Sequence, residues 1–297
     1  MIRNLLTVDV EDWRQSTLDH RLEITERVVT NTRRLLDLFD AGGARGTFFV
    51  LGLVAERFGA LVREIAGRGH EIASHGTSHT PVYSLDRETF RTDVRRSIRA
   101  IEDAAGVRVS GYRAPDFSIT EKSLWALEVL AEEGLSYDSS IFPFRGPRYG
   151  IPAAFDRPCR VRCRANPRFA EFPLATVKVG GLRMPVAGGG YFRLLPYAVV
   201  RAALHRINRG GAPATCYFHP YELDTEELRE PGPRVPLLLR LAQGIGRARV
   251  AVRLARLLRD FSWRPASSFL NEEEWFEGRT LDLHALPGRG QRWQGRR

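Results

Sequence analysis

The sequence predicts an α/β protein built as a distorted (β/α) barrel of about seven strands, with a helical C-terminal extension. Short apolar runs that indicate buried strands alternate with segments of roughly ten to fifteen residues whose apolar side chains recur at helical spacing. This alternation favours right-handed βαβ units and a parallel sheet. A chain of 297 residues can bury one large core, and barrels of this length commonly form a single domain.

The alternation is regular from residue 5 to residue 140. The expected strands are 5–10, 46–52, 70–73, 107–113 and 134–140, and the expected helices are 25–39, 53–69, 86–105 and 120–133. Gly42 and Gly43 end the first helix, as glycines commonly do. Pro115 ends the fourth strand, because a proline forces the residue before it into an extended conformation.

After the fifth strand, frequent proline, glycine and arginine indicate an insertion near 144–195. Within it, 177–186 predicts a β-hairpin and 188–192 a flexible loop that contains aromatic residues. A helix over 196–209 and a last strand over 214–218 follow, so that the barrel is complete before the C-terminal part begins.

We expect three parts in the chain. A barrel domain covers 1–224, a helical extension packed on the barrel covers 225–286, and a disordered tail covers 287–297, which is polar, glycine-rich and without periodicity. The extension contains a basic amphipathic segment over 235–261. Packing of its apolar stripe on the barrel is the favoured interpretation, and peripheral contact with an anionic membrane is the alternative.

The composition favours a cytoplasmic protein, at most attached to the inner membrane surface. Of the net charge of +10, +7 lies in residues 229–297, which contain fourteen arginines and seven acids. Three cysteines are an odd number and fit a reducing compartment. We recognise no signal peptide and no apolar stretch of the roughly 18 residues that a membrane span requires. The basic region also lacks the modules and grooves of a nucleic-acid-binding protein, so no nucleic-acid partner is expected.

The first strand ends in a cluster of three acids, Asp9, Glu11 and Asp12. Carboxylates at the C-terminal end of a strand are typical of site residues in α/β proteins, because these folds place their chemistry at that edge of the sheet. An N-cap for the next helix is the alternative, but three acids in four positions exceed what a cap requires. We therefore expect these acids to belong to a functional site.

Two histidines, His75 and His79, follow the third strand and are four residues apart. On a helix or a tight helical turn, this spacing brings both imidazoles to one face, where they can share one divalent cation. Gly76 stands where a zincin protease has its glutamate base, so the pair would hold a metal without providing a base. Two hydrogen-bonded structural histidines at a loop end are the alternative.

Further candidates lie at other strand ends and therefore at the same edge of the sheet. Arg113 ends the fourth strand, Asp138 the fifth and His219 the last. Tyr191 lies in the glycine-rich loop, which either lines a sugar cleft or is a plain turn.

This order of residues resembles the polysaccharide deacetylase family, the NodB-homology or carbohydrate esterase 4 hydrolases. Residues 5–13 resemble its first motif, 74–79 its second, 113–117 its third and 218–219 its last, so that the resemblance covers residues 2–224.

Three stretches narrow the resemblance to one branch of the family. Residues 9–13, 137–143 and 218–224 look most like the branch associated with bacterial exopolysaccharide and exosortase loci, which carries an extra C-terminal segment.

The resemblance implies a hydrolase that removes N-acetyl groups from an N-acetylhexosamine-containing polysaccharide or its lipid-linked precursor, in exopolysaccharide biosynthesis. It implies one divalent cation bound by Glu11, His75 and His79, zinc being expected first and cobalt, manganese or nickel being alternatives. Many family members have adjacent aspartates in the first motif, whereas this sequence has Asp9 followed by Glu11 and Asp12. Asp12 therefore remains an alternative to Glu11 as the metal ligand.

The resemblance also implies the roles of the other residues. Asp9 is expected to act as the base, Arg113 to pair with Asp9 and keep it ionised, and His219 to protonate the departing amine. The expected substrate-binding residues are Pro115, Asp116, Phe117, Asp138 and Tyr191.

Three other interpretations compete with this one. An amidase or imidase of the same fold, acting on a small C–N substrate without a metal, is disfavoured by the intact acid and histidine set. A catalytically silent sugar-binding protein is disfavoured by the presence of both Asp9 and His219. A structural zinc site built from Cys159, Cys163, Cys216 and His219 is disfavoured by the long gap between the second and third cysteine.

Overall fold

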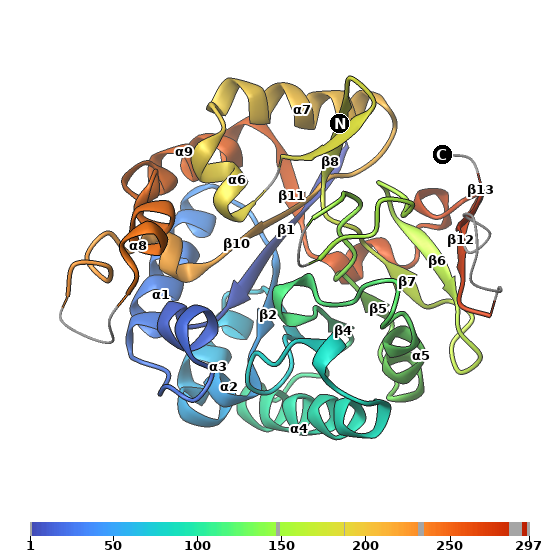
Figure 1. Cartoon of the computed structure of the whole chain (residues 1–297), viewed down its shortest axis with the longest axis horizontal. Helices are drawn as coiled ribbons and strands as arrows, with labels where there is room; N and C mark the ends of the chain where they lie inside the picture. The colour runs from blue at the N-terminus through green and yellow to red at the C-terminus, as the bar shows by residue number, and fades with distance from the viewer. Residues whose placement is uncertain (1, 147–148, 187, 231–234, 285–292, 296–297) are drawn as a thin grey trace.

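The computed structural model describes residues 2–146, 149–186, 188–230, 235–284 and 293–295. A curled sheet runs through the centre of the molecule, and helices surround it (Figure 1). Seven parallel strands form the main part of the sheet, in the spatial order β10, β1, β2, β3, β4, β5 and β7. Their bounds are Thr215–Phe218, Arg3–Val10, Thr47–Val50, Glu71–Ser74, Gly111–Tyr112, Tyr137–Asp138 and Ala170–Glu171. The predicted α/β fold with a distorted barrel of seven strands is confirmed.

The barrel is open between its first and last strands. Within the described residues, β10 and β7 do not pair with each other. The chain that follows β7 partly bridges the gap instead, since the Ala175 N–H donates to the Thr215 carbonyl at 3.1 Å and Gly188 forms a parallel bridge with Tyr217.

Except for α8, which has no buried residue, the helices bury apolar side chains against the sheet or against each other. Their bounds are α1 Arg27–Ala41, α2 Gly52–Arg57, α3 Gly59–Gly67, α4 Arg87–Ala105, α5 Trp125–Glu132, α6 Gly189–Leu194, α7 Tyr197–Arg209, α8 Leu237–Gly244 and α9 Arg247–Asp260. The ends of α4 show how the sequence sets them: Asp86 caps the first turn by accepting from the Thr89 N–H, and Gly106 ends the helix in the left-handed conformation. Short helical turns complete the chain, namely η1 Arg14–Leu18, η2 Val82–Ser84, η3 Pro115–Phe117, η4 Pro220–Leu223, η5 Ala266–Phe269 and η6 Glu273–Trp275.

Three predicted elements differ from the structure. The helix expected over 53–69 breaks at Phe58 into α2 and α3. The helix expected over 235–261 breaks before Gly246, whose φ of 81° interrupts helical geometry, into α8 and α9. The loop expected over 188–192 is instead the start of the helix α6.

The C-terminal extension is not purely helical. The strand β11, Ser262–Arg264, pairs in parallel with the start of β1. Beyond β7 the sheet continues through β6 Cys159–Arg162, β12 Arg279–Asp282 and β13 Trp293–Gly295. Most of the tail expected to be disordered lies outside the described residues, and its described part, 293–295, is a strand paired with β12. The hairpin predicted over 177–186 is present as β8 Thr176–Val179 and β9 Leu182–Pro185.

The apolar stripe of α9 faces inward, as the favoured interpretation predicted. Val250, Leu254, Leu257 and Leu258 are all buried, and α9 contacts α1, α7 and η4. No helix within the described residues is both long and apolar enough to cross a membrane.

Candidate metal centre

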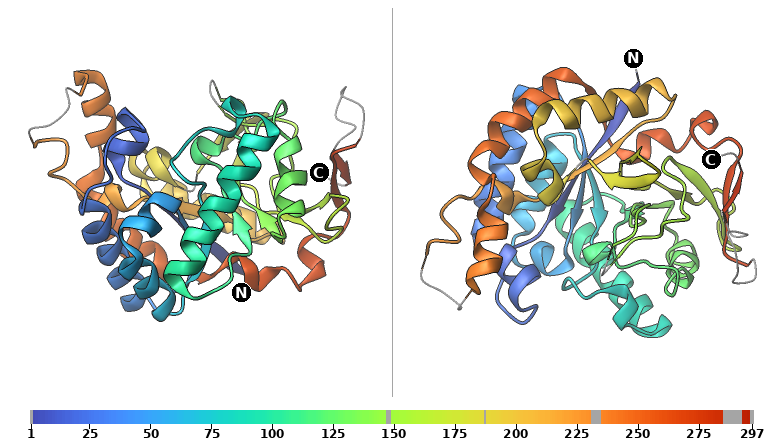
Figure 2. Two further views of the ribbon diagram at one scale, coloured as in Figure 1. Left: turned by 90° about the horizontal axis from the view of Figure 1, so that it is seen from below. Right: turned by 45° about the horizontal axis from the view of Figure 1, so that its top comes forward.

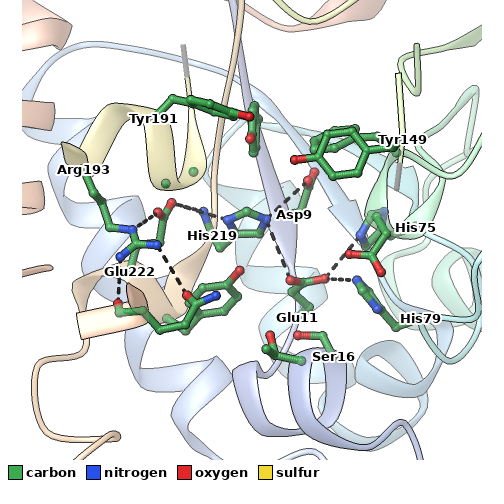
Figure 3. Close-up of a pocket in the computed structure, with 18 of the residues that line it drawn as sticks. Asp9, Glu11, Ser16, His75, His79, Tyr149, Tyr191, Arg193, His219 and Glu222 are labelled. Atoms are coloured by element: carbon green, nitrogen blue, oxygen red, sulfur yellow. Dashed lines mark hydrogen bonds and ion pairs between the residues drawn. The ribbon is translucent and has the colours of Figure 1, made fainter. Parts of the chain in front are cut away.

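A cavity of about 510 Å³ opens at the C-terminal edge of the parallel sheet, where β1, β3 and β10 end. Figure 3 shows the polar side chains that surround it. Asp9 and Glu11 enter from β1, the two histidines from the loop after β3, and His219 from the end of β10. Because parallel strands present the same end to the same edge, residues more than 200 positions apart in the sequence meet here.

Glu11, His75 and His79 form a buried cluster whose ligand atoms all lie within 4.8 Å of one another. Glu11 Oε2 lies 2.6 Å from His79 Nε2 and 3.4 Å from His75 Nε2. No N–H or O–H within the described residues donates a hydrogen bond to this buried oxygen. The atoms therefore form a set of one carboxylate oxygen and two imidazole nitrogens that a divalent cation would bring into coordination.

The electrostatics of the cluster favour a bound cation. Burial alone would raise the pKa of Glu11, but the imidazoles of His79 and His75 outweigh this effect and hold the pKa well below its usual range. Burial alone would lower the pKa of His79, but the negative charge of Glu11 raises it. A cation at this position would take the place of the proton on the imidazole and would neutralise the same carboxylate.

A hydrogen bond orients His75 toward the cluster. Its Nδ1 lies 2.8 Å from the carbonyl oxygen of Arg113, and only a protonated Nδ1 can donate to that oxygen. The other ring nitrogen, Nε2, faces Glu11 and is the one available to a cation. Such a carbonyl contact behind a histidine is typical of metal ligands, because it fixes both the tautomer and the ring.

The backbone that carries the histidines is an irregular loop, so the helical turn expected over 75–79 is wrong. Gly76 has a φ of 75° and His79 a φ of 64°, both in the left-handed region that helices do not use. The Thr77 N–H donates to Asp93, which anchors the loop to α4. The two imidazoles converge through these two left-handed residues, and not through the periodicity of a helix.

The structure distinguishes between Glu11 and Asp12 as candidate metal ligands. The carboxylate of Asp12 is turned away from the cluster and accepts hydrogen bonds from the N–H groups of Arg14 and Thr25 and from the Thr25 hydroxyl. Asp12 thus caps the turn that leads into α1, which is the structural role that the sequence also allowed for an acid at this place. As an alternative metal ligand, Asp12 is not supported by this geometry.

Asp9 pairs with Arg113, as expected. Arg113 Nη1 lies 2.7 Å from Asp9 Oδ1, and both side chains are buried. The guanidinium also donates to the Thr7 hydroxyl and to the carbonyl and hydroxyl of Ser139, and it stacks 4.2 Å from the ring centre of Phe49. These contacts leave Asp9 Oδ2 to face His219 across the cavity, at 3.8 Å from Nε2.

His219 is held by a buried ion pair that the sequence did not suggest. Its Nδ1 lies 3.4 Å from Glu222 Oε2, and Glu222 Oε1 accepts from Arg193 Nε at 3.0 Å (Figure 3). Burial alone would lower the pKa of His219, but the hydrogen bond with Glu222 and the charges of Glu11, Glu222 and Asp9 raise it to about 9. Only the position of Glu222, three residues after His219, could have indicated this partner.

The expected substrate-binding residues divide into two groups. Asp116, Phe117 and Tyr191 line the cavity, together with Tyr149, Tyr217 and Tyr221, which sequence reasoning missed. Pro115 and Asp138 do not line it. Asp138 is buried behind the strand ends, where it accepts from the backbone N–H and hydroxyl of Ser140, so it is a structural residue rather than a substrate ligand.

The cysteine alternative is not supported either. Cys159, Cys163 and Cys216 are buried free thiols, and His219 contacts carboxylates and not sulfur. In the part of the chain that the structure describes, Glu11, His75 and His79 are the one group of three such side chains that could hold a metal ion.

Two known families match successive parts of the chain. Residues 16–135 match the Polysaccharide deacetylase family, and residues 139–271 match a Domain of unknown function (DUF3473). A peptidoglycan-N-acetylglucosamine deacetylase of Bacillus cereus is 32% identical over 98 residues, which are 33% of this chain and 36% of the relative. A chitooligosaccharide deacetylase of Sinorhizobium fredii is 31% identical over 130 residues, 42% of this chain and 58% of the relative. The chain thus spans less than two thirds of the length of these relatives.

A solved structure extends the likeness of the fold to almost the whole chain. The probable polysaccharide deacetylase from Pseudomonas aeruginosa PAO1 superposes with a TM-score of 0.59 at 14% identity, covering 92% of this chain and 90% of that one. The chain therefore contains a polysaccharide deacetylase domain of the NodB or carbohydrate esterase 4 type, followed by the DUF3473 domain.

Proposed function

We propose that this protein is a metal-dependent hydrolase that removes N-acetyl groups from an N-acetylhexosamine-containing polysaccharide or from its lipid-linked precursor. The observation that carries the proposal is the meeting of three units in one cavity: the Glu11–His75–His79 cluster, the Asp9–Arg113 pair and His219. The names of the deacetylase relatives give the substrate class. Resemblance to the exopolysaccharide-associated branch supports a role in exopolysaccharide biosynthesis in the cytoplasm.

Glu11, His75 and His79 would hold the cation, for which zinc is the first candidate given two imidazoles and one carboxylate. A cation with open coordination positions lowers the pKa of a water molecule and polarises an amide carbonyl. Asp9 would accept the proton of the attacking water, because its Oδ2 faces the cavity while Arg113 occupies Oδ1. Attack on the acetamide carbon, followed by cleavage of the C–N bond, yields acetate and an amine.

His219 would give a proton to the departing nitrogen. Its Nε2 faces the cavity, 3.8 Å from both Asp9 Oδ2 and Glu11 Oε1, while Glu222 holds the other ring nitrogen. The raised pKa keeps the imidazole protonated at neutral pH, as a general acid requires. The tyrosines that line the cavity provide flat apolar faces of the kind that pack against sugar rings.

The test measures metal content and acetate release on the same preparations. We expect the purified protein to bind one divalent cation and to release acetate from N-acetylglucosamine oligomers, and a chelator to abolish this release. The His75→Ala/His79→Ala variant should lose both metal and activity. The variant His284→Ala changes a histidine far from the cluster and should keep both.

Two results would contradict the proposal. A parent protein that binds the oligomers and never releases acetate would favour a catalytically silent sugar-binding protein. Hydrolysis of a small cyclic amide that survives removal of the metal would favour the amidase or imidase alternative.

A further inference from the structure

The helix α8 exposes a continuous apolar face. Leu237, Leu238, Leu241 and Ile245 are between 53% and 82% exposed, and no residue of α8 is buried. The spacing of these four residues places them on one side of the helix, within an arc of roughly 100°. We call them the α8 face. Large apolar side chains gathered in this way on a surface indicate an interaction site, because scattered single residues would be ordinary.

The C-terminal end of α8 is anchored to the body of the protein. Arg193 of α6 donates hydrogen bonds to the carbonyl oxygens of Gln243 and Ile245 at the end of α8. Arg253 of α9 in turn donates to the carbonyl oxygen of Arg193. This end of α8 is therefore attached to α6, while the helix lies at the periphery of the molecule (Figures 1 and 2). The apolar side chains are presented outward on a helix that is anchored at one end.

The segment that forms α8 and α9 is strongly basic. Residues 235–259 contain six arginines and no acidic residue. Two of these arginines point inward, since Arg247 pairs with Glu227 and Arg253 bonds to backbone carbonyls. The other four are exposed and, among the described residues, form no ion pair: Arg240, Arg249, Arg256 and Arg259. The outward side of α9 also carries Val252, which is 74% exposed.

The helix α8 also reaches the cavity of the metal centre, through the side opposite the α8 face. Gln243 of α8 and Leu194 at the end of α6 both line the cavity, and the Leu194 side chain is 60% exposed. The four residues of the α8 face do not themselves line the cavity.

We propose that the α8 face docks on an anionic membrane surface, with its leucines among the upper acyl chains and its arginines on lipid phosphates. An apolar face flanked by arginines without acids is the combination that interfacial helices use on anionic lipids. A second copy of this chain would suit the surface less well, because a symmetric contact would bring the unpaired arginines of both copies together. Anionic lipid neutralises the same charges.

This docking favours the lipid-linked one of the two substrates of the proposed deacetylase function, on which this part of the inference rests. A protein bound at the membrane surface would meet N-acetylated sugars that are attached to membrane lipids there. The basic surface that meets the membrane is then α8 with the outward side of α9, and not the apolar stripe of α9, which is buried.

The test is co-sedimentation of the full chain with lipid vesicles. We expect binding to phosphatidylcholine vesicles that contain phosphatidylglycerol, weaker binding at high salt, and little binding to phosphatidylcholine alone. Leu237→Ser/Leu238→Ser/Leu241→Ser should lower the affinity at least about tenfold, because the apolar contact is lost. Arg240→Gln/Arg249→Gln should lower the affinity for the anionic vesicles in the same assay.

Matched controls change equally exposed residues elsewhere. Val179→Ser/Leu182→Ser on the β8–β9 hairpin and Arg99→Gln/Arg108→Gln near the end of α4 should bind vesicles like the parent. Acetate release from soluble oligomers should be unchanged in the leucine variant, since these leucines do not line the cavity. Vesicle binding without acetate release would refute the deacetylase and leave the docking intact.

Three outcomes would overturn the docking proposal: no binding of the parent to either kind of vesicle, equal binding to both kinds, or the same loss in control and α8 variants. A parent that is dimeric, binds no vesicles and becomes monomeric in the leucine variant would assign the α8 face to a second copy.

Discussion

Replacing Glu222 by glutamine should shift the alkaline limb of the pH–rate profile. Glutamine keeps the shape of the side chain and can still accept from Arg193, but it removes the charge that lies 3.4 Å from His219 Nδ1. At an effective dielectric constant of about 20, two unit charges at this distance attract by about 5 kcal/mol, or between three and four pKa units, which is the upper limit of the effect. Because both charges are spread over two atoms, we expect a fall of about one to two units.

The consequence for the rate follows from the role of His219. With the pKa at about 9, the parent should keep its general acid protonated through neutral pH and lose activity as the pH rises through 9. In the glutamine variant this loss should begin near pH 7 to 8, so that its rate at pH 8.5 falls about tenfold below the parent while its rate at pH 6 changes little. The assay is kcat/KM for acetate release across the pH range, at constant metal content.

Stability has to be measured beside the rate, since Glu222 also neutralises the buried Arg193. The raised pKa of His219 stabilises the folded state below pH 6.5, and this contribution disappears as the pH rises through about 9. The variant should therefore lose part of its stability at acidic pH. Glu226→Gln, at an exposed glutamate nearby, is the control. An alkaline limb that stays at the parental position in Glu222→Gln would refute the assignment of His219 as the acid positioned by Glu222.

Three further predictions concern single residues. Asp9→Asn should lower turnover by about 10² or more while metal content persists, whereas Asp37→Asn on the surface of α1 should change neither; unchanged turnover would remove Asp9 as the base. Burial and the charge of Asp138 raise the pKa of Glu171 well above its usual range, so the free energy of unfolding of the wild type should decline as the pH rises above 4.5. Urea unfolding should show a smaller decline with pH in Glu171→Gln. The same pH dependence in both proteins would contradict this prediction. Gly76→Ala should lower the free energy of unfolding by about 1–2 kcal/mol and weaken metal binding in calorimetry, because an alanine is strained at a φ of 75°. Gly67→Ala, where the added methyl group has free space, should change neither. Equal metal affinity of Gly76→Ala and the parent would show that the loop tolerates the change.

The meeting of the site residues at the strand ends was predictable from the sequence because it depends on a simple rule. Parallel strands bring their C-terminal ends to one edge, so an acid cluster after the first strand, histidines after the third and a histidine after the last had to meet. The sequence therefore predicted Glu11, His75, His79 and the Asp9–Arg113 pair as neighbours, and the structure places them so.

The directions in which individual side chains point were not predictable from the spacing of residues in the sequence. Whether Glu11 or Asp12 faces the histidines depends on how the chain turns after Trp13. That turn brings Thr25, which lies beyond the turn in the sequence, to Asp12, and Thr25 provides two hydrogen-bond donors for its carboxylate. The convergence of His75 and His79 depends on left-handed backbone at Gly76 and His79, which periodicity arguments cannot foresee for a histidine. Arg193 and Glu222 were missed because their partnership exists only after α6 has packed beside η4.

The pairing of β11 with β1 ties the metal centre to the order in which the chain is synthesised. β1 carries Asp9 and Glu11, yet its hydrogen-bonding partners include β10 on one side and, at its first residues, β11, both from the last third of the sequence. A ribosome that releases the N-terminal end first would leave this strand without those neighbours until residues 215–218 and 262–264 have emerged. Contacts so distant in sequence form slowly, because a long loop must close before they can stabilise anything. The catalytic strand would thus be among the first segments made and among the last completed.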